Sequence, residues 1–152
     1  MKAPNMITVL VLDVDGVLTD GKLYYGPSGE VLKQFHVHDG LAISVFLKAG
    51  IQVAVISGRE SEPLTCRLDQ LGVQYRFLAC KDKPKALKQL CQMLGVSLAN
   101  VAYVGDDLID LAAMKMVGFA ACPADAVADV QQHSHYIAKK AGGCGAVREI
   151  CC

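Results

Sequence analysis

The sequence lacks an excess of charge of either sign, because its 15 lysines and arginines balance 15 aspartates and glutamates. It therefore gives no sign of nucleic acid or of an acidic membrane surface as a partner. It also lacks any run that approaches the roughly 20 apolar residues of a membrane-spanning helix. Lys2 precedes only a short apolar stretch that Asp13 and Asp15 interrupt, so we expect no signal peptide and a cytoplasmic location.

The cysteines lack the spacing of a binding site. All 7 are scattered along the chain, without a CxxC pair and without a Cys/His cluster at zinc spacing. In a cytoplasmic protein, this odd number indicates free thiols. Internal repeats and low-complexity tracts are also missing, while 53% of the residues are hydrophobic. These features predict one compact domain over residues 1–152 with an ample core.

Apolar runs typical of buried strands alternate with amphipathic helical patterns. We predict strands at 6–12, 51–56, 75–79, 100–104 and 117–121, and one of weaker pattern near 135–138. We predict helices at 40–49, 60–71 and 84–94, which end at Gly50, Gly72 and Gly95. Repeated β–α units with continuously apolar strands indicate an α/β protein, in which a doubly wound parallel sheet is covered by helices on both faces in three layers.

Residues 22–37 interrupt this alternation. Two strand-like runs flank the turn-forming stretch 27–30, which predicts a β-hairpin between the first strand and its helix. An isolated hairpin is only marginally stable, and this one carries apolar side chains on both faces. We therefore expect it to pack on another surface, for which a second subunit is a candidate.

Polar side chains follow four of the predicted strands. In an open α/β sheet, ligands bind beyond the carboxyl ends of the strands, so these side chains are expected to form one site. In chain order they are Asp13 and Asp15, then Ser57, Gly58 and Arg59, then Lys83, then Asp106, Asp107 and Asp110.

The residue types at these strand ends suit a magnesium ion and a phosphate. Mg²⁺ takes one or two carboxylates together with phosphate oxygens and water, and Asp13 and Asp106 come from different strand ends that such an ion would bring together. Ser57, with the backbone N–H groups at the start of the next helix, suits a phosphate. Lys83 adds positive charge where a phosphoryl group would lie. Each residue alone is more often a cap, a turn acid or a solvated lysine, but the combination indicates phosphoryl transfer.

The motifs resemble those of known phosphatases. DVDGVLTDG, ISGR, the helix-opening lysine and GDDLID are similar to the four motifs of the haloacid dehalogenase-like phosphatases. The longer stretches DVDGVLTDGKLYYGPSGEVLKQFHVHDG, NVAYVGDDLIDL and AGGCGAVREIC resemble the small, capless 3-deoxy-D-manno-octulosonate 8-phosphate phosphatases, over residues 6–150. The resemblance implies a Rossmann-like fold with a β-hairpin flap after the first strand and no large cap domain.

The resemblance also implies catalytic roles. Asp13 would be the nucleophile that forms an aspartyl-phosphate, and Asp15 would be the general acid and then the base. Mg²⁺ would be held by the Asp13 carboxylate, the Asp15 backbone carbonyl and Asp106. Asp107 would support these ligands, and Asp110 would support the loop. The phosphoryl oxygens would be held by Ser57, Gly58 and Lys83.

Substrate contacts follow from the same resemblance. It assigns sugar-acid binding to His36, His38, Asp39, Gly40, Arg59 and Arg67. Three positions depart from the family pattern, because His38, Ser44 and Cys144 stand where arginines are usual. Arginine binds a carboxylate through two parallel hydrogen bonds, which these three side chains cannot do. Arg59 favours the phosphatases of 3-deoxy-D-manno-octulosonate 8-phosphate over the related phosphatases that act on nine-carbon sialic-acid-type 9-phosphates.

The expected function is Mg²⁺-dependent hydrolysis of 3-deoxy-D-manno-octulosonate 8-phosphate. The resemblance implies a homotetramer in which hairpins assemble and a neighbouring subunit helps to close the site. One alternative is a phosphatase of a nine-carbon sialic-acid-type 9-phosphate. A second is a catalytically idle copy that serves oligomerisation or regulation. A phosphorylated receiver domain would need its phospho-accepting aspartate after the third strand, where Lys81, Asp82 and Lys83 stand instead.

Overall fold

The computed structural model describes residues 6–152, so residues 1–5 of the predicted domain lie outside the described part. Six parallel strands form one sheet with the predicted α/β character. In spatial order the strands are β5 (Tyr75–Phe77), β4 (Gln52–Ile56), β1 (Val9–Leu12), β6 (Val101–Val104), β7 (Phe119–Cys122) and β8 (Tyr136–Ile137). Each predicted strand is therefore present, although all six are shorter than predicted.

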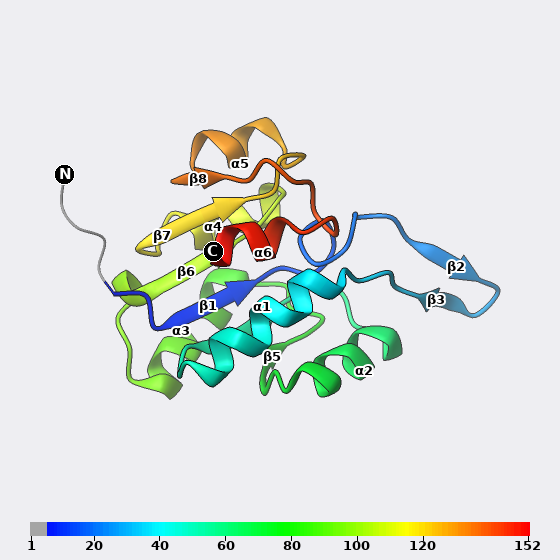
Figure 1. Ribbon diagram of the computed structural model, residues 1–152, viewed down its shortest axis with the longest axis horizontal. Coiled ribbons are helices and arrows are strands. Elements are labelled where there is room, and N and C mark those ends of the chain that lie inside the picture. Colours follow the sequence, from blue (N-terminus) through cyan, green and yellow to red (C-terminus); the bar gives the residue numbers. More distant parts are fainter. Residues whose placement is uncertain (1–5) are drawn as a thin grey trace.

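Helices cover both faces of the sheet and give the predicted three layers (Figure 1). Alternate residues of β1 point to opposite faces, so Leu10 and Leu12 join one core while Val9 and Val11 join the other. The first core lies under α1 (Val37–Lys48), α2 (Glu62–Leu71) and α6 (Ala146–Cys151). The second lies under α3 (Lys83–Leu94), α4 (Leu111–Met114) and α5 (Ala128–Gln132).

Local signals explain where the long helices begin and end. The helix α1 begins three residues earlier than predicted, because the ring Nδ1 of His36 accepts a hydrogen bond from the His38 N–H at 3.0 Å and caps it. Gly72 and Gly95 end α2 and α3 with left-handed φ angles of 75° and 64°, as a glycine at a helix end predicts. Two short 3₁₀ turns, η1 (Leu98–Asn100) and η2 (Leu108–Asp110), flank β6.

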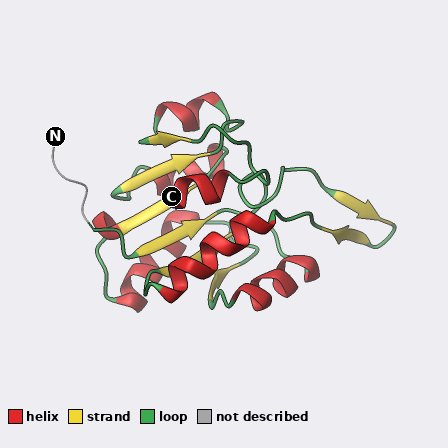
Figure 2. Ribbon diagram, in the orientation of Figure 1, coloured by secondary structure: helices red, strands yellow, loops and turns green. Residues whose placement is uncertain are grey.

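The predicted hairpin projects from the body of the molecule (Figure 2). It consists of β2 (Tyr24–Gly26) and β3 (Gly29–Leu32), which pair antiparallel. Its strands are shorter than the predicted 22–37, because residues 33–36 have no regular structure and α1 begins at residue 37. Its exposed apolar side chains are Leu23, Tyr25, Val31 and Leu32.

Within residues 6–152 no second domain interrupts the sheet, which agrees with the expectation of no large cap. Within the same residues, every helix falls short of the length and apolar character needed to cross a bilayer.

Candidate active site

The loop after β1 carries the first two carboxylates. Asp13 directly follows the strand and continues its pairing, because the Asp13 N–H donates to the Val104 carbonyl at 3.0 Å. The Thr19 hydroxyl closes the loop by accepting from the backbone N–H groups of Gly16 and Gly21 at 3.3 and 3.2 Å. Gly16 has a φ of 88°, and a Cβ there would collide with the carboxylate of Asp106. Glycine at position 16 therefore allows the loop to approach β6 closely.

Three carboxylates gather beyond the ends of β1 and β6. Single oxygens of Asp13, Asp106 and Asp110 lie within 4.8 Å of one another. Lys83 enters this cluster from the start of α3, with its Nζ 3.1 Å from Asp13 Oδ1 and 2.8 Å from Asp110 Oδ1. The structure thus brings the predicted nucleophile, the predicted metal ligand Asp106 and the predicted lysine together.

Asp110 is the buried support of this cluster. Its Oδ1 accepts from Lys83 and from the hydroxyl of Tyr103, both at 2.8 Å. Its Oδ2 accepts from the backbone N–H groups of Asp106 and Asp107 at 3.0 and 3.4 Å. Both oxygens are therefore occupied, which fits the prediction that Asp110 supports the loop.

Burial makes the charge of this cluster unfavourable. Burial and the charge of Asp110 raise the pKa of Asp13 well above its usual value, and Lys83 only partly opposes this. Burial and Asp110 likewise raise the pKa of Asp106 to about 7. Three carboxylates face one ammonium group, so the cluster is short of positive charge. A divalent cation with oxygen ligands would supply this charge, and the donor set fits one.

A cavity opens beside the cluster at the carboxyl ends of the strands. The predicted residues that line it are Asp13, Asp15, Ser57, Gly58, Arg59, Asp106 and Asp107. The helix that follows this loop, α2, begins at Glu62, two residues later than predicted. Ser61 caps that helix, so the loop 57–59, and not the helix N-terminus, lines the cavity.

Apart from Arg59, the residues predicted to bind the substrate do not line the cavity of the chain to which they belong. Their role in substrate binding stays a prediction. Asp39 is buried under α6, where its Oδ1 accepts from the Arg148 N–H at 3.0 Å. A Cβ at Gly40 would collide with the guanidinium of Arg67, so this glycine lets α1 and α2 pack closely. The two remaining residues, both at the start of α1, are the capping His36 and the exposed His38.

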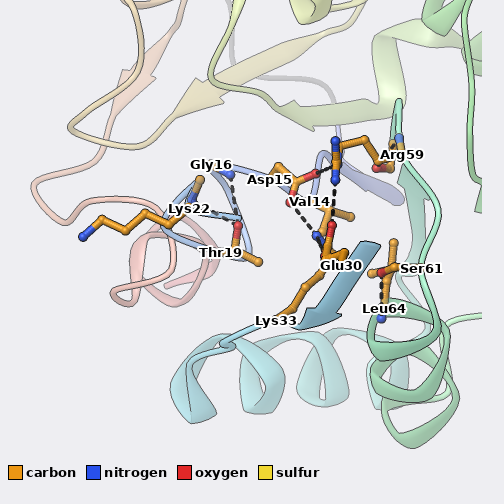
Figure 3. A network of polar contacts seen from close by, with 12 residues as sticks. Val14, Asp15, Gly16, Thr19, Lys22, Glu30, Lys33, Arg59, Ser61 and Leu64 are labelled. Atoms are coloured by element: carbon orange, nitrogen blue, oxygen red, sulfur yellow. Dashed lines mark hydrogen bonds and ion pairs between the residues drawn. The ribbon is translucent and has the colours of Figure 1, made fainter. Parts of the chain in front are cut away.

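Sequence reasoning missed three residues at the site. Tyr103 lies in β6 among aliphatic residues, and a hydroxyl in a wholly buried strand is the signal that could have found it, because such a group needs a partner. Lys33 reaches Asp15 from the end of the hairpin, and Glu30 of the hairpin pairs with Lys33 (Figure 3). Nothing in the local pattern distinguishes these two from solvated hairpin residues.

The glycine-rich loop 142–145 packs on the loop after β1. The Gly143 N–H donates to the Val17 carbonyl at 3.1 Å. A Cβ at Gly142 would collide with the carbonyl of Gly16, and one at Gly143 would crowd the backbone between Thr19 and Asp20. This loop therefore packs against the backbone of the loop that carries Asp13 and Asp15.

Comparisons with known proteins agree with this geometry. The family model of the haloacid dehalogenase-like hydrolases matches residues 30–118. The 3-deoxy-D-manno-octulosonate 8-phosphate phosphatase of Escherichia coli K12 is 44% identical over 150 residues, which cover 99% of this chain and 79% of the relative. The phosphatase of the same name from Haemophilus influenzae is 43% identical over 144 residues, which cover 95% of this chain and 80% of the relative.

Solved structures show the same fold. The cobalt-bound deoxy-D-mannose-octulosonate 8-phosphate phosphatase from Haemophilus influenzae superposes with a TM-score of 0.93 at 43% identity, covering 95% of this chain and 85% of that one. The Moraxella catarrhalis enzyme in complex with magnesium, phosphate and KDO superposes with a TM-score of 0.92 at 39% identity, covering 95% and 83%. The chain therefore belongs to the haloacid dehalogenase-like hydrolases, within the family of the 3-deoxy-D-manno-octulosonate 8-phosphate phosphatases.

Proposed function

We propose that this protein hydrolyses 3-deoxy-D-manno-octulosonate 8-phosphate in a reaction that depends on Mg²⁺. The observation that carries the proposal is the cluster of Asp13, Asp106 and Asp110 with Lys83, which opens into the cavity beside it. The Moraxella catarrhalis relative holds magnesium, phosphate and KDO together, which supports this metal and this sugar acid. The similarity over nearly the whole chain favours this function over an idle copy or a receiver domain.

The hydrogen bonds of the cluster agree with the metal ligands that the family resemblance implies. Both oxygens of Asp110 already accept hydrogen bonds, so this carboxylate supports the site and leaves coordination to others. The family resemblance implies that the carboxylates of Asp13 and Asp106 and the backbone carbonyl of Asp15 would hold Mg²⁺. When bound, the ion would neutralise the carboxylates and polarise the phosphate.

The chain's own residues would share the chemical work. A carboxylate oxygen of Asp13 attacks phosphorus, and Lys83 restrains that carboxylate through its 3.1 Å contact. As the bond from phosphorus to the sugar oxygen breaks, Asp15 protonates that oxygen. Asp15 then removes a proton from the water that hydrolyses the aspartyl-phosphate. Ser57 and Gly58 hold phosphoryl oxygens, and Arg59 at the cavity wall meets the sugar acid.

We further propose a homotetramer that works in the cytoplasm. The hairpin leaves Leu23, Tyr25, Val31 and Leu32 exposed, and a second copy packed on it would bury them. The residues at the start of α1 would then contact a substrate in a neighbouring cavity. All 7 cysteines are free in the structure, which supports a reducing compartment.

A substrate panel tests the proposal. Steady-state hydrolysis is measured with Mg²⁺ for the octulosonate 8-phosphate, a nine-carbon sialic-acid-type 9-phosphate and common sugar phosphates. We expect the highest kcat/KM for the first, because discrimination between substrates lies in that ratio. Asp13→Asn should abolish turnover, and Asp15→Asn should keep Mg²⁺ binding while losing turnover. The proposal fails if no phosphomonoester is hydrolysed or if Asp13→Asn behaves like the wild type.

A further inference from the structure

A network of four charged side chains connects the hairpin to the catalytic loop (Figure 3). We call it the flap network, and its members are Asp15, Glu30, Lys33 and Arg59. Asp15 is the proposed general acid, and Arg59 belongs to the cavity wall. Glu30 lies in β3 and Lys33 directly follows this strand. Neither residue is among the predicted site residues.

Lys33 is the centre of the flap network. Its Nζ lies 2.7 Å from Asp15 Oδ1 and 2.6 Å from Glu30 Oε1. The Lys33 side chain is only 3% exposed and that of Glu30 only 6%, although both lie on a segment that projects from the body. A lysine this deeply covered loses its hydration, and two carboxylates at this distance offset the loss.

Arg59 forms the second arm of the flap network. Its Nη2 donates to Glu30 Oε2 at 2.7 Å, and its Nε lies 3.5 Å from Asp15 Oδ2. Each Asp15 oxygen therefore faces one cation, and Glu30 bridges the two cations. Partial burial would raise the pKa of Glu30, but hydrogen bonds from Lys33 and Arg59 outweigh this and lower it. Glu30 thus remains ionised and holds both cations.

The orientation of the Asp15 side chain depends on this arrangement. Among residues 6–152, Lys33 is the only group that donates a hydrogen bond to the Asp15 carboxylate. Asp13 is fixed differently, because it contacts Lys83 and accepts from the Val14 N–H at 2.7 Å. The nucleophile is therefore held by the body of the protein, whereas the proposed acid is held by the hairpin.

We propose that Lys33, fixed by Glu30, is a positioning residue that orients the Asp15 carboxyl group toward the leaving oxygen of the substrate. This inference rests on the proposed function, because it assigns Asp15 the proton transfer. A misplaced acid slows a reaction steeply, since a displacement of about 1 Å costs on the order of 100-fold in rate. The hairpin is then a part of the catalytic machinery as well as a surface for other copies.

Leaving-group chemistry separates this role from simple folding support. A sugar alkoxide leaves only when it receives a proton, whereas p-nitrophenolate is stable enough to leave without one. Lys33→Met keeps the length of the side chain and removes its charge. We expect kcat/KM for the sugar 8-phosphate to fall roughly 10- to 100-fold, because this ratio reports the steps up to departure of the leaving group. The kcat/KM for p-nitrophenyl phosphate should change no more than about threefold, because no general acid is needed in those steps.

Matched variants complete the experiment. Lys22→Met makes the same change at the other end of the hairpin, where Figure 3 shows the side chain directed away from Asp15, and it should leave both activities unchanged. Lys33→Arg should restore most of the sugar phosphatase activity, and Glu30→Gln should reproduce the selective loss in a weaker form. Adding Lys33→Met to Asp15→Asn should cause no further loss, because the two residues act as one unit.

Several outcomes would overturn the proposal. Equal losses of kcat/KM on both substrates, an unchanged or raised kcat/KM for the sugar 8-phosphate, or additive effects in the Asp15→Asn background would each contradict it. Light scattering on every variant checks that the oligomeric state is that of the wild type, so that a loss through assembly is identified as such and counts against the proposal. If the wild type itself hydrolyses neither substrate, the proposed function fails, which is a different result from a failure of Lys33 alone.

Discussion

Replacing Tyr103 by phenylalanine should destabilise the protein by removing one buried hydrogen bond. The Tyr103 hydroxyl donates to Asp110 Oδ1 at 2.8 Å, and both residues are 0% exposed. A hydrogen bond to a charged group contributes about 1.5–3 kcal/mol to stability. Lys83 keeps its bond to the same oxygen, so we expect the lower half, about 1.5–2 kcal/mol. For a chain of this size the melting temperature should fall by roughly 3–8 °C.

Urea denaturation of the metal-free protein measures this loss, and Tyr136→Phe is its matched control. The Tyr136 hydroxyl also donates to a carboxylate, Glu149 Oε2 at 2.7 Å, but this tyrosine is 38% exposed. Water can replace that bond, so the control should lose no more than about 0.5 kcal/mol. Equal losses in the two variants, or a loss below about 0.5 kcal/mol for Tyr103→Phe, would refute the argument that burial sets the strength of this bond.

Three further predictions concern the cluster and the loop that supports it. The raised pKa of Asp106, about 7, means that its proton stabilises the metal-free fold at acidic pH and that this contribution is lost as pH rises through about 7. Because Mg²⁺ replaces that proton, the rise in Tm on adding Mg²⁺ should be larger at pH 8 than at pH 6, and an equal rise at both would contradict this. Lys83→Met leaves buried carboxylates without their cation and should lower the free energy of unfolding by about 3–5 kcal/mol in urea denaturation. An unchanged free energy of unfolding would contradict this prediction. Gly142→Ala pushes a methyl group into the Gly16 carbonyl and should lower both kcat and the free energy of unfolding, the latter by about 1–3 kcal/mol. Wild-type activity in this variant would show that the loop after β1 and the loop 142–145 move independently.

The parallel sheet and the strand-end residues were predictable because both depend on short-range patterns. Apolar runs of strand length gave all six strands, and Gly72 and Gly95 marked helix ends at their left-handed φ angles. The convergence of Asp13 and Asp106 followed from the rule that parallel strands present their carboxyl ends at one edge. These features need no knowledge of which distant side chains meet.

The remaining site residues depend on contacts that the sequence does not encode locally. Asp39 resembles a cavity residue in the motif, but α6 from the far end of the chain covers it and its Oδ1 binds the Arg148 N–H. The partnership of Lys33 with Asp15 depends on how the hairpin folds back toward the loop. The short helices α4, α5 and α6 were also missed, because four to six residues are too few to show a helical period.

The packing of the glycine loop 142–145 on the loop after β1 joins a late segment of the chain to an early one. A ribosome makes Asp13 early and this loop late. A chain stopped at residue 141 would contain every proposed catalytic side chain and yet lack the backbone contact that supports the first of them. We therefore expect chains that end or are cleaved before this loop to be inert, so that the phosphate ester is hydrolysed only by molecules whose synthesis has reached this loop.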